Sequence, residues 1–391
     1  MTGSRLQLSA TGAQDVFLTK SNELKLNMFK YKYHKYVNFS TDTHKLILNQ
    51  SASFGSSSSC DILKYGHLLS KMFLHLKLPK LVKIDGTYAC WSDSLGYAIF
   101  NSPIELQIGG ITVDKIYPRF ADIYDDLTRD SSGNNLMLLK SDVYSSTKLN
   151  ATKDIDLIIP LDFFFAKKYS MALPLLSMDQ NIKITFQLKN FEDLIHYDGN
   201  IQPQNVNIIE SYIFAEYIFL DDTITDLFKT QKHQYIIDQV QLNEEYISGN
   251  SFNASLNFNN PCKELIFCFG NNIDNNYFNY SNVTGDPFLK EATLFLDGKK
   301  RYDTLPEFYY RSIIPRNIHS VIPMKYIYIM PFCLKPEDNQ PTGSLNMNRF
   351  TDVILSLSLN NNNSGCSLYV YAITYNVITI ENGMLSLEFM Y

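Results

Sequence analysis

Apolar and polar side chains alternate with a period of two along several segments of this chain, and this pattern constrains the fold more than any other feature. Every second residue from Ile182 to Leu188 is apolar, with Lys, Thr and Gln between. The same alternation runs from Ile104 to Ile108 before a Gly-Gly turn, and from Leu355 to Leu359 before a polar stretch. Successive side chains of a strand point to opposite faces, so this period is typical of half-buried strands. The sequence predicts an all-β fold of antiparallel sheets joined by turns.

The order of these segments occurs twice along the chain. In each half, a strand that ends in a glycine turn is followed by an alternating strand and then by an aromatic-rich strand. These segments begin at Ile104, Asn181 and Ser211 in the first half, and at Ala292, Asp352 and Ser367 in the second. Each half is long enough for an eight-stranded antiparallel sandwich. We therefore expect two such β-sandwiches in tandem, with short helices in loops and at the domain junction.

The best helix candidate lies between the two halves, from Asp222 to Gln231. Asp221 and Asp222 precede and open it as capping residues and as acids near the positive end of the helix dipole. We place the linker with this short helix at residues 222–234. The predicted organisation is then an N-terminal arm at 1–22, a first sandwich at 23–221 and a second at 235–391.

Composition excludes several classes of protein. Of the 391 residues, 45% are apolar and 19% are charged, so the chain can bury a sizeable core and is not a disordered protein. The net charge is −6, which argues against a chain whose main task is to coat nucleic acid. The longest apolar run, Leu368 to Ile373, is far shorter than the ~20 residues that cross a bilayer. The N-terminus has no hydrophobic signal core, so we expect no secretory route.

Charge is distributed unevenly. Residues 1–40 carry six basic and two acidic side chains, a net charge of +4. Such a segment fits an inward-facing arm near an anionic lipid or polymer, and it fits a solvated strand face better. Within it, Lys30 to Tyr36 alternates Lys and Tyr in the manner of a nucleic-acid stacking platform. A strand with Tyr on one face and Lys on the other is the favoured interpretation.

Sequence motifs of catalysis, phosphate binding and metal binding are mostly absent from this chain. The chain has no phosphate-binding glycine loop, no HExxH and no GxSxG motif. His67 and His75 are the histidines that we considered as a metal pair, and ordinary packing roles are favoured. Ser56 to Ser59 lack a nearby base, and the acid pairs Asp125-Asp126 and Asp221-Asp222 suit loop ends and helix caps. We predict no catalytic, cofactor-binding or metal-binding residues, and no cofactor. The six cysteines are expected to be reduced and mostly buried.

Ordered motifs along nearly the whole chain resemble those of the major capsid proteins of nucleocytoplasmic large DNA viruses. Asn260 stands where histidine is common in that family, and His67 stands where an acid is usual. The motifs are GAQDVFLT from Gly12, YGHLLSKMFLHLKLP from Tyr65, IELQIGGITVDK from Ile104, LIIPLDFFFAKKYSMALPLLSM from Leu157, EYIFLDD from Glu216, HQYIIDQVQ from His233, LNFNNPCKEL from Leu256, FCLKPEDNQPTGSLNMNRF from Phe332 and YVYAITYNVITIENGM from Tyr369.

The resemblance implies a double jelly roll and a structural, non-enzymatic role. A protein of this family is expected to form homotrimeric, pseudo-hexagonal capsomers that tile the icosahedral shell of a large double-stranded DNA virus. The expected partners are other copies of the chain, minor capsid and penton proteins, and an inner membrane or minor protein at the N-terminal arm, without direct nucleic-acid binding. The expected location is the virion capsid, after assembly in the host cytoplasm.

Three alternatives stay open at this point. The first is a scaffold or minor capsid paralogue with the same fold. The second, from a different class, is a two-cupin-like metalloenzyme, which would need several histidines and a carboxylate on neighbouring strands. The third is a glycan-binding double sandwich, supported by the Tyr-bearing loop from Asn276 to Asn282.

Overall fold

The computed structural model describes residues 36–82, 84–86, 88–92, 95–128, 154–200, 207–270, 277–360 and 365–389. The chain divides into two units, residues 1–38 and 39–391, and the account below concerns the second. The predicted arm at 1–22 lies outside the described residues, as does nearly all of the basic segment from Lys30 to Tyr36. Both therefore stay predictions.

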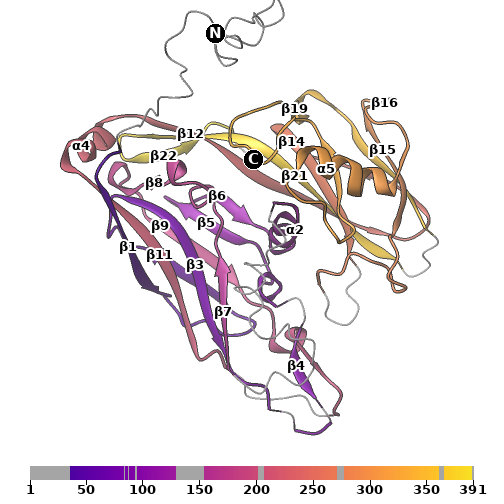
Figure 1. Cartoon of the computed structure of the whole chain (residues 1–391), viewed down its shortest axis with the longest axis horizontal. Helices are drawn as coiled ribbons and strands as arrows, with labels where there is room; N and C mark the ends of the chain where they lie inside the picture. Colours follow the sequence, from indigo (N-terminus) through magenta and orange to yellow (C-terminus); the bar gives the residue numbers. More distant parts are fainter. Residues whose placement is uncertain are drawn as a thin grey trace, which may run out of the picture. The chain divides into compact units, whose positions relative to one another are not determined.

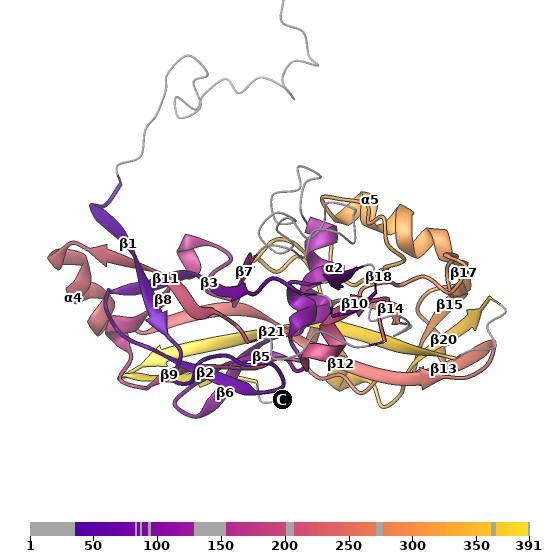
Figure 2. The same ribbon diagram turned by 90° about the horizontal axis from the view of Figure 1, so that it is seen from below.

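The first sandwich consists of two antiparallel sheets (Figures 1 and 2). One has the strand order β1-β11-β3-β7, with the short β8 paired to β3, and the other has the order β2-β9-β5-β6. A separate two-stranded pair, β4 and β10, lies in the connections. The strands are β1 (Phe39–Ile47), β2 (Ser57–Ile62), β3 (Leu68–Leu78), β4 (Ala89–Trp91), β5 (Ile104–Ile108), β6 (Ile111–Ile116), β7 (Ile155–Pro160), β8 (Leu173–Pro174), β9 (Ile182–Gln187), β10 (Ile195–Tyr197) and β11 (Glu210–Leu220).

The second sandwich repeats this plan. One sheet has the order β12-β21-β14-β18, with β19 and β22 as additions, and the other has the order β13-β20-β15-β16, with β17 added. The strands are β12 (His233–Ile247), β13 (Ser251–Ser255), β14 (Pro261–Gly270), β15 (Leu289–Leu296), β16 (Lys299–Lys300), β17 (Leu305–Pro306), β18 (Tyr328–Pro331), β19 (Leu345–Asn346), β20 (Val353–Leu359), β21 (Cys366–Glu381) and β22 (Met384–Leu387).

The two sandwiches correspond strand for strand. In chain order, the main strands β1, β2, β3, β5, β6, β7, β9 and β11 occupy the sheet positions of β12, β13, β14, β15, β16, β18, β20 and β21. The repeated order of segments in the sequence is therefore a true duplication of topology. The all-β prediction of two eight-stranded antiparallel sandwiches in tandem, a double jelly roll, is confirmed.

The alternating segments form strands with one face in the core, as predicted. In β9, Ile182, Ile184 and Phe186 are buried and the residues between them are half-buried. The segments in β5 and β20 show the same pattern. Buried apolar side chains from both sandwiches form one continuous cluster, so the core does not stop at the junction between them. All six cysteines are free thiols, and all but Cys90 are buried, as expected.

The helices include one that was predicted and two that were not. Helix α4 (Asp222–Thr230) lies where the sequence placed it, but the side chain of Asp221 accepts no capping hydrogen bond. Instead, the Asp221 carbonyl accepts from the amides of Ile224 and Thr225. Helices α2 (Pro118–Thr128) and α5 (Ile314–Ile318), the latter preceded by the π-helix η8 (Tyr309–Ile313), were not located from sequence. The short 3-10 helices are η2 (Tyr97–Ile99), η4 (Tyr169–Met171), η5 (Leu175–Ser177), η6 (Phe191–Leu194) and η9 (Met347–Arg349).

No helix among the described residues has the length and apolar character needed to cross a bilayer.

Candidate functional site at the junction of the two sandwiches

The histidines considered as a metal pair lie at opposite ends of one strand. His67 precedes β3 and His75 lies near its end, so eight residues at about 3.3 Å each separate them by roughly 26 Å. The His67 ring accepts a hydrogen bond at Nδ1 from the amide of Leu220 (2.9 Å). The His75 Nε2 lies 3.0 Å from Asp156. Within the described part of the chain, no cluster of three or more His, Cys, Asp or Glu residues could hold a metal ion.

The other candidate residues lie in regular secondary structure or pack within the fold. Ser57–Ser59 belong to strand β2, and the acid pair Asp125-Asp126 lies on α2. The Tyr-bearing loop that would support glycan binding does not present its rings to solvent. Tyr280 is 1% exposed, and half-buried Tyr277 lies under the Lys189 ammonium, 3.0 Å from the ring centroid. Both rings pack at the junction, so the loop lacks the exposed Tyr side chains on which the glycan-binding interpretation depended.

Helix α2 lies between the two sandwiches, as both views of the ribbon show (Figures 1 and 2). It follows β6 of the first sandwich and packs on β21 of the second. The Phe120 ring is 5.4 Å from that of Tyr371, and Tyr117 meets the same ring edge-on at 6.2 Å. The Arg119 guanidinium lies 4.0 Å from the Tyr369 ring centroid and donates to the Tyr277 carbonyl (2.5 Å). These contacts combine aromatic packing with a cation–π interaction, a strong class of contact when water is excluded.

An ion cluster ties the next turn of α2 to the second sandwich. Asp122 accepts hydrogen bonds from the Tyr280 hydroxyl (3.0 Å) and the Lys325 ammonium (2.7 Å). Lys325 also lies 3.2 Å from Asp126, one helical turn further on. Burial lowers the pKa of Lys325, but the two carboxylates outweigh this effect and raise it. Helix α2 therefore contacts the second sandwich through ion pairs as well as through aromatic rings.

A second set of charges bridges the sandwiches along strand β12. Asp238 of β12 lies 3.1 Å from the Lys263 ammonium in the second sandwich and 3.6 Å from that of Lys167 in the first. The Lys263 side chain is fully buried. Burial raises the pKa of nearby Asp114 to about 6, against the opposing effect of Lys167. Asp114, Lys167 and Asp238 border a cavity of about 510 Å³ whose walls come from both sandwiches.

Backbone contacts complete the junction at the chain's C-terminal hairpin. The amide of Asp179 donates to the Gly383 carbonyl (2.7 Å), and the amide of Leu385 donates to the Gln180 side chain (2.7 Å). Gly383 has φ of +80°, and a Cβ there would lie 2.2 Å from an Asp179 carboxylate oxygen. Only glycine fits this turn without strain. On the opposite side of β21, the Gln239 amide donates to the Val113 carbonyl of β6 (2.8 Å).

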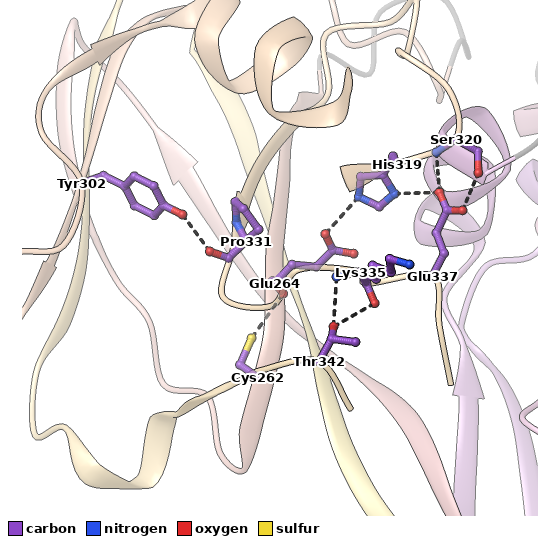
Figure 3. Close-up of polar contacts among 9 residues, drawn as sticks. All are labelled: Cys262, Glu264, Tyr302, His319, Ser320, Pro331, Lys335, Glu337 and Thr342. Carbon is purple, nitrogen blue, oxygen red and sulfur yellow. Dashed lines mark hydrogen bonds and ion pairs between the residues drawn. The ribbon is translucent and has the colours of Figure 1, made fainter. Parts of the chain in front are cut away.

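A buried carboxylate and histidine lie inside the second sandwich, close to the junction (Figure 3). The Nε2 of His319 is 3.0 Å from Glu264, and its Nδ1 is 3.2 Å from Glu337, which also borders the interdomain cavity. The side chains of His319 and Glu264 are fully buried. Burial lowers the pKa of His319, but hydrogen bonding to Glu264 and the charges of both carboxylates outweigh it and raise the pKa. The charged imidazole thus compensates a carboxylate that is cut off from water.

This arrangement predicts a pH-dependent stability. A histidine whose pKa is raised by folding stabilises the fold fully below its unfolded pKa of about 6.5, and the gain disappears as pH rises through the folded value. At pH 6, His319→Gln should lower the free energy of unfolding by about 1.5–3 kcal/mol, because it removes two charge-assisted hydrogen bonds. Thermal unfolding of both proteins from pH 6 to 9 tests this. The gap between them should narrow with rising pH, and a constant gap would contradict the assignment.

Comparison with known proteins identifies the fold and the family. The family model described as "Major capsid protein N-terminus" matches residues 27–221, and the one described as "Large eukaryotic DNA virus major capsid protein" matches residues 225–386. The chain belongs to the major capsid proteins of large eukaryotic DNA viruses. It is 26% identical to the major capsid protein of Pyramimonas orientalis virus and 27% identical to that of Paramecium bursaria Chlorella virus 1, and each alignment covers 100% of both chains.

Solved structures agree on the architecture of this capsid protein. A chain of the quasi-atomic model of the PBCV-1 virus capsid aligns with a TM-score of 0.83 at 24% identity, covering 93% of this chain and 100% of that one. The Faustovirus major capsid protein aligns with a TM-score of 0.77 at 13% identity, covering 95% and 94%. The double jelly roll is therefore retained where sequence identity is low.

The junction is the candidate functional site of this capsid protein, because its contacts join the two sandwiches. The aromatic contacts of α2, its ion cluster and the Asp238 charges connect residues of both sandwiches. Sequence reasoning missed this site because its members lie far apart in the chain.

Proposed function

We propose that this capsid protein self-assembles into pseudo-hexagonal homotrimeric capsomers that tile the icosahedral shell of a large double-stranded DNA virus. The observation that supports the proposal is the strand-for-strand duplication within one compact unit with a continuous core. Three copies of a chain with two similar sandwiches place six similar bodies around a threefold axis, which gives a nearly hexagonal outline. A closed ring leaves no complementary patch unsatisfied within it, whereas contacts between rings stay free for tiling.

The native mass of the purified chain tests this proposal. The main species should have about three times the chain mass of 45.0 kDa. Electron microscopy at higher concentration should show hexagonal sheets. A single-chain mass at all concentrations would contradict it. Presence of the chain in purified virions separates a shell protein from a scaffold of the same fold.

The proposal extends to organisation and partners. The limits are those that the sequence predicts: an arm at 1–22, sandwiches at 23–221 and 235–391, and a linker at 222–234. We expect the protein to have no catalytic activity, and to be assembled in the host cytoplasm. Minor capsid and penton proteins are the expected neighbours of the trimer in the shell.

The basic N-terminal arm is proposed to face an inner membrane or a minor capsid protein. Its basic side chains would attract anionic headgroups or an acidic protein surface. Deletion of residues 1–19 should leave the trimer mass unchanged and should reduce incorporation into shells, measured in an assembly assay with viral components. Full assembly by the truncated protein would contradict this role.

A further inference from the structure

The C-terminal hairpin of the chain turns on Asn382 and Gly383. Glu381 pairs with Met384, so these two residues alone connect β21 to β22. Their φ angles are +52° and +80°, the left-handed conformation of the two-residue turns in which Asn-Gly is a preferred pair. The sequence contains this pair nowhere else. Asn382 is therefore the one asparagine of the chain that is followed by a residue without a side chain.

The Asn382 side chain is also unrestrained. The residue is exposed, and its amide makes no hydrogen bond within the described part of the chain. Asn282, in the turn between β14 and β15, differs in this respect. Its Oδ1 accepts hydrogen bonds from the amides of Thr284 and Asp286 and from the Thr284 hydroxyl. The Asn382 amide can thus rotate toward its own backbone, whereas the Asn282 amide must first break several hydrogen bonds.

Glycine in the next position allows an asparagine amide to react with the main chain. Gly383 has no Cβ, so its backbone nitrogen is open to approach. This nitrogen, once its proton passes to hydroxide, attacks Cγ of Asn382. A C–N bond forms, the side-chain nitrogen leaves as ammonia, and a five-membered cyclic imide results. Water then opens the ring at either carbonyl and gives aspartate or isoaspartate, in which the main chain runs through the former side-chain carbonyl. The net reaction is the hydrolysis of an amide by water, without an oxidant.

We propose that Asn382 is a site of spontaneous deamidation, and that this reaction loosens the contact between the two sandwiches. The inference goes beyond the proposed function, because the turn and its contacts belong to a single chain. It does not depend on the trimer.

The turn is one of the places where the second sandwich rests on the first. The Gly383 carbonyl accepts a hydrogen bond from the amide of Asp179 (2.7 Å), and Gly383 forms an isolated bridge with Met178. Two residues further on, the amide of Leu385 donates to the Gln180 side chain (2.7 Å). Isoaspartate lengthens the main chain by a carbon atom directly before Gly383. The carbonyl of Gly383 then no longer lies opposite the Asp179 amide.

The new negative charge acts in the same direction. The Asp179 carboxylate lies directly against Gly383, since a Cβ on this glycine would be 2.2 Å from its Oδ2. On the other side of Asn382, Glu381 is exposed and pairs with Lys232 at 3.3 Å. Deamidation places a third carboxylate between these two. Like charges repel, so both products weaken the contact, and isoaspartate does so more because it also shifts the main chain.

Deamidation is irreversible, so the fraction of altered junctions grows with the age of the protein. Peptide mapping by mass spectrometry, during incubation of the purified full-length chain in mildly alkaline buffer, measures this fraction at each asparagine. Asn382 should convert at least about tenfold faster than Asn282, because each hydrogen bond that must first break slows the reaction by about a factor of five. Methyl transfer by an isoaspartyl methyltransferase should label the peptide that contains residue 382.

Two variants separate this reaction from other ageing. Asn382→Gly removes the reactive amide and suits the turn, since Gly-Gly is also a preferred pair there. Asn382→Asp supplies the charge without the additional main-chain carbon. The unfolding temperature of the unmodified protein should fall by about 2 °C as residue 382 converts. That of Asn382→Gly should stay constant over the same period, and Asn382→Asp should lie between fresh and fully converted protein from the start.

Hydrogen exchange gives a local measurement on the unmodified protein. The amides of Asp179 and Leu385 bind across the junction, so their exchange should become about tenfold faster in converted protein. The amide of Leu265, in the core strand β14 of the second sandwich, is the internal control and should be unchanged.

Each failure contradicts a different part of the proposal. Conversion of other asparagines while residue 382 stays intact would overturn the site. Conversion of residue 382 without faster exchange at Asp179 and Leu385 would overturn its effect on the junction. An equal fall of the unfolding temperature in Asn382→Gly would assign the lost stability to another residue. The native mass of the chain enters none of these outcomes, so they are separate from the test of the trimer.

Discussion

Asp238→Ala is expected to lower the free energy of unfolding by about 3–5 kcal/mol, because it leaves a fully buried ammonium without its counter-charge. Lys263 lies 3.1 and 3.2 Å from the two Asp238 oxygens, and its ammonium also donates to the Asp338 carbonyl at 3.2 Å. Lys167 loses the same carboxylate, but its side chain is 32% exposed, so water compensates it in part. In a chain of 391 residues, this loss lowers the unfolding temperature by about 5 °C.

Replacing the lysine instead of the aspartate shows how much of the lost stability comes from the unpaired Lys263 ammonium. Lys263→Met should cost less than Asp238→Ala, because Asp238 keeps Lys167 as a partner. The double variant Asp238→Leu with Lys263→Met removes both members of the buried pair and should recover much of the loss. Asp303→Ala is the control, since this carboxylate is 83% exposed and its pair with Lys300 adds little stability. Equal losses for Asp238→Ala and Asp303→Ala would show that the buried pair does not stabilise the fold.

The strands were predictable because their signal is local. The buried face of β9 can be predicted from six residues, because Ile182, Ile184 and Phe186 alternate with polar side chains. The same alternation indicates β5 and β20. The duplication was visible for the same reason, since each half repeats one order of such segments. Helix α4 was found from acids at its start, although the Asp221 side chain does not cap it.

Helix α2 was missed although it carries a helical signal. Phe120, Ile123, Tyr124 and Leu127 follow the i, i+3, i+4, i+7 spacing of an amphipathic helix, and Pro118 suits its first turn. The stretch resembles a loop because it lies between strands and carries three aspartates. Two of these, Asp122 and Asp126, bind Lys325, some 200 positions away in the chain, and no local pattern indicates such a partner.

The buried charges were beyond sequence reasoning for a related reason. Lys263 and Glu264 are adjacent in β14, and both are fully buried although neighbours on a regular strand point to opposite faces. A register shift between Cys262 and Glu264 breaks that alternation. Their partners, Asp238 and His319, come from β12 and from the loop after α5. Only the fold brings these four residues together.

Tyr371→Ala is expected to separate the unfolding of the two sandwiches. Tyr371 is 1% exposed, and its ring packs on Phe120 of α2 and on Tyr117, which directly precedes this helix. Truncating a buried aromatic ring costs about 3–5 kcal/mol, and here the lost contacts couple one sandwich to the other. Calorimetry of the unmodified protein should show one transition because the core is continuous across the junction. The variant should show two.

The matched control for this prediction is Phe267→Ala. Phe267 is fully buried, and its ring packs on Tyr328 (5.2 Å) and Phe269 (6.4 Å) within the second sandwich. Its loss should cost a similar free energy and lower the unfolding temperature without splitting the transition. The comparison therefore separates stability from coupling, because both variants remove one buried ring and only one of them removes it from the junction. A single transition in both variants, with equal losses of stability, would mean that α2 packs on the second sandwich without coupling the unfolding of the two sandwiches.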